Sequence, residues 1–562
     1  MNGSSLPINV KKTLEKTVRL FLLLIVAVSV MVSLPTATGK SSSNSYNYKF
    51  TVNEDGFTWV DITFQSREST GSSWVFVPKF SPWKYTVTPP GEITESKLDE
   101  TQDYVGEDYY FYQVFEFFFV SESSFLMEIQ FNMTEGALII EPRGIFFSPQ
   151  IGFPPDSVGE AKAEVLFPSN YRVKEEFIAS SSRITTYTVV SSNRVLFDLQ
   201  DNLERLQIEF ETAATAPTWK QLSQGVFSFR TVERYENYAF QILTLFNAVY
   251  DDFTDLFNVT LEDIDVQFFI PEFETLLSVG GYVPFSGQKM GEINVNIFFV
   301  RAVNGTIQVI ALHELVHHFL WKAGLSPSDL LWFHEGTAQY VSIDTATELG
   351  YEGAEMEKDR LEIGVSQLGN DFSFLQEWTP ENQPVDVTRN YVASYYVVSR
   401  LAEEYGGLNY YKRFFELIRG LKIESNDELA FHLSLAANAS VDLKLKLWGF
   451  DIRLLYTGSK ISPDLIYEAE KAVDGLSPVF LPYNLVAKFL YQQALLRLER
   501  GDVDGAKQLF EAAISLANLA PLLTLLTLVA IFAIVAYILL KRTSKPSFEL
   551  PPLPPTFEQA LA

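Results

Sequence analysis

His313–Gly336 reads HELVHHFLWKAGLSPSDLLWFHEG and holds four of the five histidines in this chain of 562 residues. The stretch opens with an HExxH pattern, in which His313 and His317 flank Glu314. Residues four apart on a helix differ by about 40° around the axis and about 6 Å along it, so both imidazoles can reach one ion. Glu314 then borders the open coordination position, where a carboxylate can take a proton from attacking water. The sequence predicts a helical metal site with a general base.

A third ligand is needed, because zinc in a hydrolytic site usually has three protein ligands and one water. Glu335 is the candidate, since it lies in a segment that reads as the start of a second helix after the loop 324–329. Glu335 is thus the candidate to join His313 and His317 around Zn²⁺. The alternative is a core helix whose histidines are buried and hydrogen-bonded.

These residues resemble the gluzincin zinc metallopeptidases (peptidase MA-like) of the aminopeptidase N and thermolysin-like kind. That family has HExxH, eighteen residues, and then a Glu within W-x-N-E-G-x-A. Here the intervening segment 318–334 has 17 residues, and His334 stands where the family usually has Asn. A loop one residue shorter costs little if Glu335 still faces the ion. The resemblance implies peptide-bond hydrolysis with zinc as the cofactor.

The residues beside these ligands have more than one reading. His318 lies about 100° around the helix from His317, which favours packing over zinc binding. His334 should point away from the ion and at best form a wall of the substrate cleft. Gln339 could accept the free ring N–H of a ligating histidine, although a solvated helix face explains it equally well.

A tyrosine is expected downstream, because in aminopeptidase N-like enzymes the phenol that hydrogen-bonds the oxyanion opens a helix ending at a Gly pair. Matching that helix to Asn390–Leu401 and the pair Gly406-Gly407 gives Tyr391 this role, although the family's P-Y-E-K-G is absent. Tyr395 or Tyr396 could serve instead.

The family's G-x-M-E-N segment, whose Glu grips the free amine of the substrate, is missing. The corresponding stretch Gly287–Asn296 reads as a half-buried strand, and its Glu292 is only a weak candidate for that role. The resemblance therefore supports a zinc peptidase without deciding between aminopeptidase and endopeptidase action.

The fold class expected is an α+β multidomain protein. Residues 46–212 show strand-like alternation, as at Val60, Ile62 and Phe64, and are predicted to form a β-sandwich or saddle. Residues 213–217 look like a boundary, and 218–454 are predicted to form a thermolysin-like zincin domain. Its expected elements are a helix at 232–252, strands at 266–270 and 293–299, and the zinc helix from about 308. Residues 460–519 read as a helical stalk with one tetratricopeptide-like hairpin.

The stretch Leu522–Leu540 predicts a membrane span. It has 19 uncharged residues, about 28 Å of helix. Lys541 and Arg542 follow it, so the positive-inside rule places the Pro-rich tail 541–562 in the cytoplasm and the bulk of the chain outside. Residues 1–39 read as a secretory signal peptide, with an uncleaved anchor as the alternative. The expected location is the cell membrane, in a single-pass arrangement.

Composition limits the partners. The chain has no cysteine, which fits a prokaryotic surface, and its net charge of −27 argues against nucleic-acid or anionic-lipid partners. The expected partners are a peptide or protein substrate and the membrane, while the oligomeric state stays open. A rival interpretation is a cell-surface binding or scaffold protein with a retired peptidase core. An intramembrane protease is disfavoured by Arg301, Asn304 and Lys322 around the motif.

Overall fold

The structure is a computed structural model, and it describes residues 44–286, 289–456 and 461–543. The predicted signal peptide 1–39 and the tail beyond Thr543 lie outside the described residues. The chain divides into two compact units. The first runs to Ile139 and includes Arg143–Ala213, and the second comprises Ile140–Pro142 and everything from Ala214 onward.

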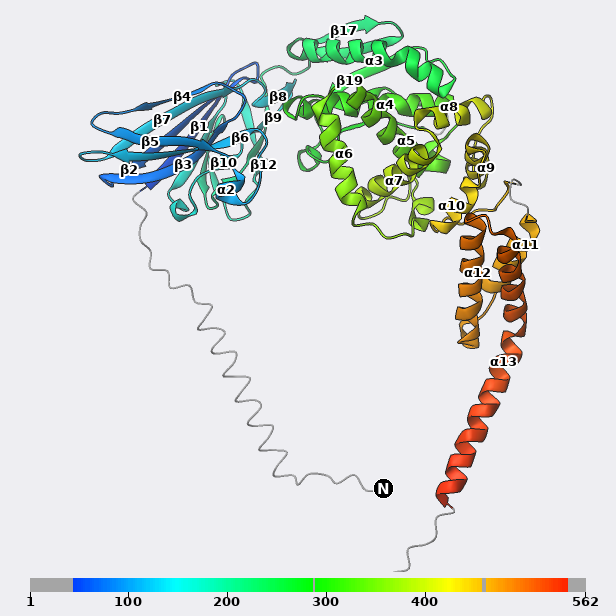
Figure 1. Cartoon of the computed structure of the whole chain (residues 1–562). Helices are drawn as coiled ribbons and strands as arrows, with labels where there is room; N and C mark the ends of the chain where they lie inside the picture. Colours follow the sequence, from blue (N-terminus) through cyan, green and yellow to red (C-terminus); the bar gives the residue numbers. More distant parts are fainter. Residues whose placement is uncertain (1–43, 287–288, 457–460, 544–562) are drawn as a thin grey trace, which may run out of the picture. The chain divides into compact units, whose positions relative to one another are not determined.

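The first unit is built from sheets (Figure 1). Within the described residues its largest sheet has the order β13 (Thr186–Ser191), β14 (Arg194–Leu199), β11 (Ala161–Leu166), β1 (Asn44–Val52), β2 (Thr58–Ser66), β7 (Phe125–Met133), β4 (Trp83–Val87). Smaller sheets are formed by β12 (Arg172–Ser180), β16 (Leu206–Glu211), β9 (Arg143–Phe147) and β8 (Ala137–Ile140), by β3 (Thr70–Pro78), β6 (Tyr112–Val120) and β5 (Glu92–Asp99), and by β10 (Ile151–Gly152) and β15 (Leu203–Glu204). A short helix, α2 (Gln102–Val105), follows β5.

Alternation explains how these sheets pack. Tyr46, Phe50 and Phe64 on β1 and β2 are fully buried and belong to one core with residues of the smaller sheets. The rings of Phe64 and Phe117 meet edge to face across this core, with centroids 5.1 Å apart. Because successive side chains in a strand point to opposite faces, one face of the large sheet is apolar and the other polar. This unit is the sheet-rich region expected from the sequence.

The second unit begins with a five-stranded sheet in the order β17 (Trp219–Gln224), β18 (Phe227–Val232), β19 (Ile264–Phe269), β21 (Ile293–Asn296), β20 (Gly281–Tyr282). Helices follow or interrupt it: α3 (Glu236–Phe257), α4 (Thr306–Lys322), α5 (Pro327–Glu348), α6 (Glu352–Val365), α7 (Val387–Tyr405), α8 (Leu408–Leu417), α9 (Asn426–Ala437) and α10 (Val441–Leu447). β20 is antiparallel to β21 at one edge of this sheet.

Element boundaries differ from expectation where local signals compete. The helix expected from residue 232 begins at Glu236, because Val232 still belongs to β18 and a 3-10 turn intervenes. The strand expected to reach residue 299 ends at Asn296, whose side-chain oxygen accepts a hydrogen bond from the backbone N–H of Phe298 and opens a 3-10 helix. α7 ends as expected before Gly406, which has a left-handed φ of 113°.

The C-terminal part is helical: α11 (Pro463–Asp474), α12 (Tyr483–Glu499) and α13 (Val503–Thr543) share one core that includes Tyr491 and Phe510. The sequence suggested a stalk helix followed by a separate span, but α13 continues through Pro521 without a break. Proline removes one backbone hydrogen bond, which a long helix can tolerate. Among the described helices, Val503–Lys541 is long and apolar enough to cross a membrane, which by itself is weak evidence for a span.

Candidate metal centre

Two helices bring the predicted ligands together. α4 carries His313, Glu314 and His317, and α5 carries Glu335. Pro327 occupies the first turn of α5, and the Ser326 side chain accepts a hydrogen bond from the backbone N–H of Ser328. Leu330 then leaves helical geometry, with φ −138° and ψ 47°. The kink allows the rest of α5 to turn Glu335 toward α4 despite the short connection.

The ligand atoms of His313, His317 and Glu335 all lie within 4.8 Å of one another. Oε2 of Glu335 is 3.1 Å from Nε2 of His313 and 3.6 Å from Nε2 of His317. Tetrahedral zinc with bonds of about 2.0–2.1 Å separates two ligand atoms by about 3.3 Å. These two distances lie on either side of that value and the third pair lies within 4.8 Å, so the three groups could close on a metal ion.

The charge of the site also fits a cation. A cavity of about 560 Å³ opens on the three groups and is lined, among the described residues, by Gly281, Tyr282, Val283, Phe285, Ser286, Met290, His313, Glu314, His317, Pro327, Ser328, Leu331, His334, Glu335, Pro380, Glu381 and Tyr391. This lining includes three carboxylates and neither lysine nor arginine. Buried carboxylates are costly unless a cation or hydrogen bonds compensate them, and a divalent ion would supply that charge.

His334 takes a position that the sequence did not reveal. It lines the cavity, as a cleft wall would, but it does not point away from the ligands. Its Nδ1 is 2.9 Å from Nδ1 of His317, and the two rings stack with centroids 5.2 Å apart. Its Nε2 lies 3.3 Å from the carbonyl oxygen of Leu325. His334 is therefore a direct partner of a predicted ligand.

These hydrogen bonds define the proton positions. The Leu325 carbonyl can only accept, so Nε2 of His334 must carry a proton. Burial lowers the pKa of His334 to about 3, so the ring is neutral and its Nδ1 is an acceptor. Nδ1 of His317 must then donate, which leaves the lone pair of its Nε2 directed toward Glu335. The hydrogen bonds from the Leu325 carbonyl through His334 thus fix the tautomer of His317 in which Nε2 carries no proton.

Glu314 lies beside the triad and is only 5% exposed. Burial raises the pKa of its carboxyl to about 8, opposed by His313 and assisted by the charge of Glu335. β20 passes close to it, since a Cβ built on Gly281 would lie 2.8 Å from Oε1 of Glu314. The edge strand therefore approaches the carboxylate because Gly281 has no side chain.

Of the three candidate tyrosines, Tyr391 lines the cavity, whereas Tyr395 and Tyr396 do not. The charge of Glu335, burial and the charge of Glu314 hold the pKa of Tyr391 well above its usual value, so the phenol stays protonated. Its ring packs edge to face on Trp378. Tyr396 instead packs on Phe372 and Trp448.

The helices that carry Glu335 and Tyr391 nearly touch at one point. A Cβ added to Gly336 on α5 would lie 2.5 Å from the carbonyl oxygen of Ser394 on α7. No side chain larger than hydrogen fits there without a shift of backbone. Gly336 therefore sets how closely the two helices pack beside the cavity.

The remaining candidates have other partners. His318 is buried outside the cavity lining, and burial lowers its pKa to about 4. Gln339 donates to Oε1 of Glu357 rather than serving a ligating histidine. Glu292 accepts from Gln267 and is 3.8 Å from Arg230, away from the cavity lining. Glu292 is thus committed to other contacts and not placed to grip a substrate amine.

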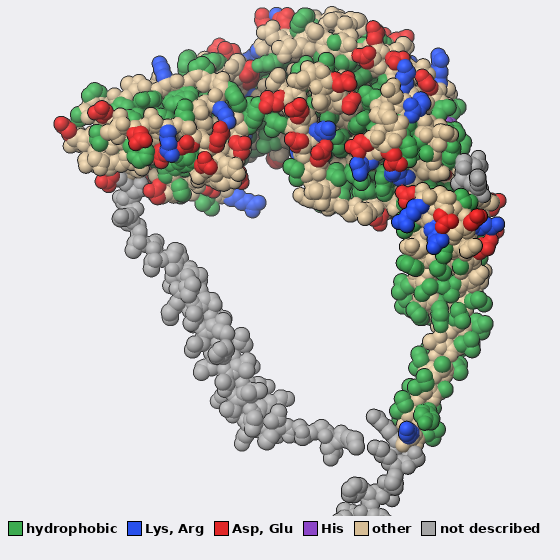
Figure 2. Space-filling model, viewed as in Figure 1, with side chains coloured by type: hydrophobic (Ala, Val, Ile, Leu, Met, Phe, Trp, Pro, Cys, Tyr) green, Lys and Arg blue, Asp and Glu red, His purple; other side chains and the backbone are tan. Residues whose placement is uncertain are grey.

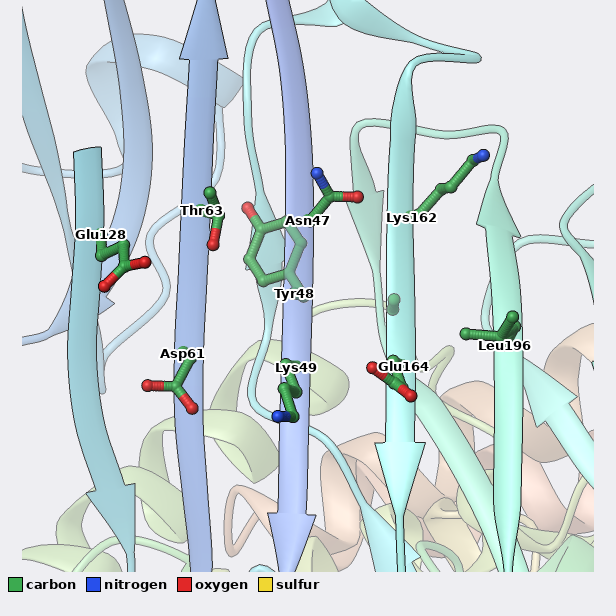
Figure 3. A pocket seen from close by; sticks show the side chains of 10 residues that line it. Asn47, Tyr48, Lys49, Asp61, Thr63, Glu128, Lys162, Glu164 and Leu196 are labelled. Carbon is green, nitrogen blue, oxygen red and sulfur yellow. The ribbon is translucent and has the colours of Figure 1, made fainter. Parts of the chain in front are cut away.

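A second hollow of about 420 Å³ lies on the polar face of the large sheet (Figure 3). Lys49 on β1 is opposite Asp61 on β2 and opposite Glu164 on β11. Such alternation of opposite charges between neighbouring strands stabilises a sheet and needs no ligand.

Comparison with solved structures finds zinc metallopeptidases. An M1 zinc metallopeptidase from Deinococcus radiodurans is 15% identical, covering 73% of this chain and 94% of its own, at a TM-score of 0.29. Yeast LTA4 hydrolase in complex with bestatin is 12% identical, covering 88% and 89%, at a TM-score of 0.30. No protein-family profile and no curated protein sequence matches the chain. Sequence identities and TM-scores this low do not support a function, so the function proposed below rests on the geometry of the site itself.

Proposed function

We propose that this chain is a membrane-anchored, extracellular zinc metallopeptidase of the gluzincin kind. The observation that carries the proposal is the convergence of His313, His317 and Glu335 within 4.8 Å, with Glu314 buried beside them. A structural core helix would not need two imidazoles and a carboxylate gathered at a cavity whose described lining holds neither lysine nor arginine. The rival retired scaffold should have lost the base or a ligand first, and all four groups are present.

His313 and His317 would bind zinc through ring nitrogens and Glu335 through its carboxylate. Zinc, when bound, supplies Lewis-acid activation of water and of the scissile carbonyl at neutral pH. His334 keeps His317 in the tautomer required for binding, by accepting its Nδ1 proton. The orientation and protonation of one ligand, His317, are thus set by a residue of the adjacent helix.

Glu314 is the general base in this proposal. Its carboxylate takes a proton from the attacking water and then delivers that proton to the leaving amine. Its closeness to β20 would put it where a substrate backbone can pass. Tyr391 would donate its phenolic hydrogen to the negative oxygen of the tetrahedral intermediate.

The decisive test is Glu314→Gln in the full chain, with a mixed peptide library and mass-spectrometric mapping of the cuts. We expect zinc content to be unchanged and the cleavage rate to fall by several orders of magnitude, because the amide cannot accept the proton. The matched control is Glu348→Gln on the exposed end of α5, which should cut like the wild type. Equal cleavage by Glu314→Gln and wild type would overturn the proposed mechanism.

The membrane location is part of the same proposal. α13 contains the uncharged run Leu522–Leu540, and the basic residues Lys541 and Arg542 follow it. By the positive-inside rule, we propose that the tail 541–562 is cytoplasmic and the metal centre extracellular. Protease added to intact cells should remove the soluble part and leave a short membrane-bound fragment. A full-length chain that washes off membranes with carbonate would contradict the anchor.

A further inference from the structure

The helical hairpin of α12 and α13 has two chemically different ends. The turn that joins the helices carries the charged residues Arg500 and Asp502, and Tyr491 and Phe510 are buried in the shared core farther along the hairpin. At the opposite end, the 3-10 turn Pro478–Phe480 and the first turns of α12 carry apolar side chains that face outward. They are Val479 (76% exposed), Leu481 (54%), Leu485 (59%), Val486 (45%) and Phe489 (61%). We call this set the apolar tip.

The apolar tip lies alongside the candidate span. The hydroxyl of Tyr483 is 2.8 Å from Oγ1 of Thr527, and Thr527 donates to the carbonyl oxygen of Leu523. Tyr483 is therefore the donor to Thr527. Thr527 lies five residues into the run that starts at Leu522, about 8 Å along the helix axis. If α13 crosses a bilayer through that run, the tip is at the depth of the outer leaflet.

The chemistry of the tip suits that depth. Residues 475–487 contain no charged side chain, and the first charge after them is Lys488, whose long stem can carry its ammonium back toward water. Lipid offers no hydrogen-bond partners, and the Tyr483 hydroxyl has its partner within the protein, on Thr527. Figure 2 shows that the lower part of this hairpin presents almost only hydrophobic side chains, continuous with the apolar surface of α13.

We propose that the apolar tip inserts into the outer leaflet of the bilayer that α13 crosses, with lipid acyl chains as its occupant. This inference rests on the membrane anchor in the proposed function. Continuity with the lipid-facing surface of α13 favours acyl chains over a second protein chain. The hairpin would then enter the membrane at two places, by the span and by the tip, which restrains the tilt of α13.

Depth-dependent fluorescence quenching tests the insertion. The chain has no cysteine, so single-cysteine variants of the full chain accept one environment-sensitive dye each. Leu485→Cys reports on the tip, Phe532→Cys (73% exposed) on the span, and Phe240→Cys on α3 (60% exposed) is a control matched to Leu485 in exposure. The variants are reconstituted in phosphatidylcholine vesicles with or without lipids that carry a quencher on the acyl chain.

We expect the dye at 485 to be quenched several-fold more than the dye at 240, and similarly to the dye at 532. Quenching at 532 but not at 485 would overturn the insertion while leaving the anchor standing. A dye at 485 that moves to an apolar environment but is not quenched by the lipids would assign the tip to another protein chain, which also overturns it. Absence of quenching at 532 would refute the anchor and the insertion together. The readout involves no catalysis, so it is independent of the peptidase proposal.

Discussion

Replacing His334 by leucine should weaken zinc binding without touching a ligand. The ring of His334 is 1% exposed and accepts the Nδ1 proton of His317 across 2.9 Å. Leucine has a similar volume and no acceptor, so the Nδ1–H of His317 would be left buried without a partner. A buried donor without a partner costs about 1–3 kcal/mol, and a factor of ten in affinity is about 1.4 kcal/mol. We therefore expect zinc to bind about 10- to 100-fold more weakly.

The assay is competition for zinc between the detergent-solubilised full chain and a fluorescent chelator, with the melting temperature of the metal-free chain measured in parallel. His318→Leu is the matched control, because His318 is also a buried histidine but lies on α4 and does not line the cavity. His334→Asn should restore part of the affinity, since its amide oxygen can accept the same proton. If His334→Leu binds zinc as tightly as the wild type, the proton arrangement inferred for His317 is wrong.

Three further results are expected. Tyr391→Phe should lower kcat about 100-fold with little change in KM, measured on one cleaved peptide, because a phenol that stabilises the intermediate acts mainly after binding. Nα-acetylated peptides should be cut within about fivefold of the rate for free-amine peptides. Among the described residues that line the cavity, Glu381 is the one carboxylate besides Glu335 and Glu314; it is exposed, and exposed ion pairs are weak. Burial acts to raise the pKa of Glu209, but hydrogen bonds from Arg143 and Lys174 outweigh it, so the pKa lies below its usual value of 4.5. The stability that these two partners give the fold is therefore fully present above pH 4.5 and is lost as the pH falls through the lowered pKa. Glu209→Gln should therefore cost about 1–3 kcal/mol in thermal unfolding at pH 7, and the difference should shrink in acid.

The parts of the site that follow from one helix were predictable. The spacing of His313 and His317 places both rings on one face of α4 whatever surrounds the helix. Glu335 could be assigned as a ligand only with the family pattern, because its orientation depends on the kink at Leu330, which the amino-acid sequence does not reveal. The role of His334 was missed, since a residue next to a ligand points elsewhere on its own helix and meets His317 only because α4 and α5 cross there.

Short and long elements were missed for different reasons. β20 covers only Gly281 and Tyr282, too few residues for an alternating pattern, yet it is the strand that approaches Glu314. α13 was divided in expectation into a helical segment ending at residue 519 and a span starting at residue 522, whereas the structure has one helix that continues through Pro521 and packs against α12 along its first part.

The near contact at Gly336 has a consequence for reading genetic variation in this protein. A methyl group at that position would act as a spacer between α5 and α7, because it would meet the carbonyl oxygen of Ser394 at 2.5 Å. Such a change would alter the separation of Glu335 from Tyr391 while leaving every reacting group intact. An alanine variant that still folds and retains its metal but turns over slowly would thus report misalignment rather than lost chemistry.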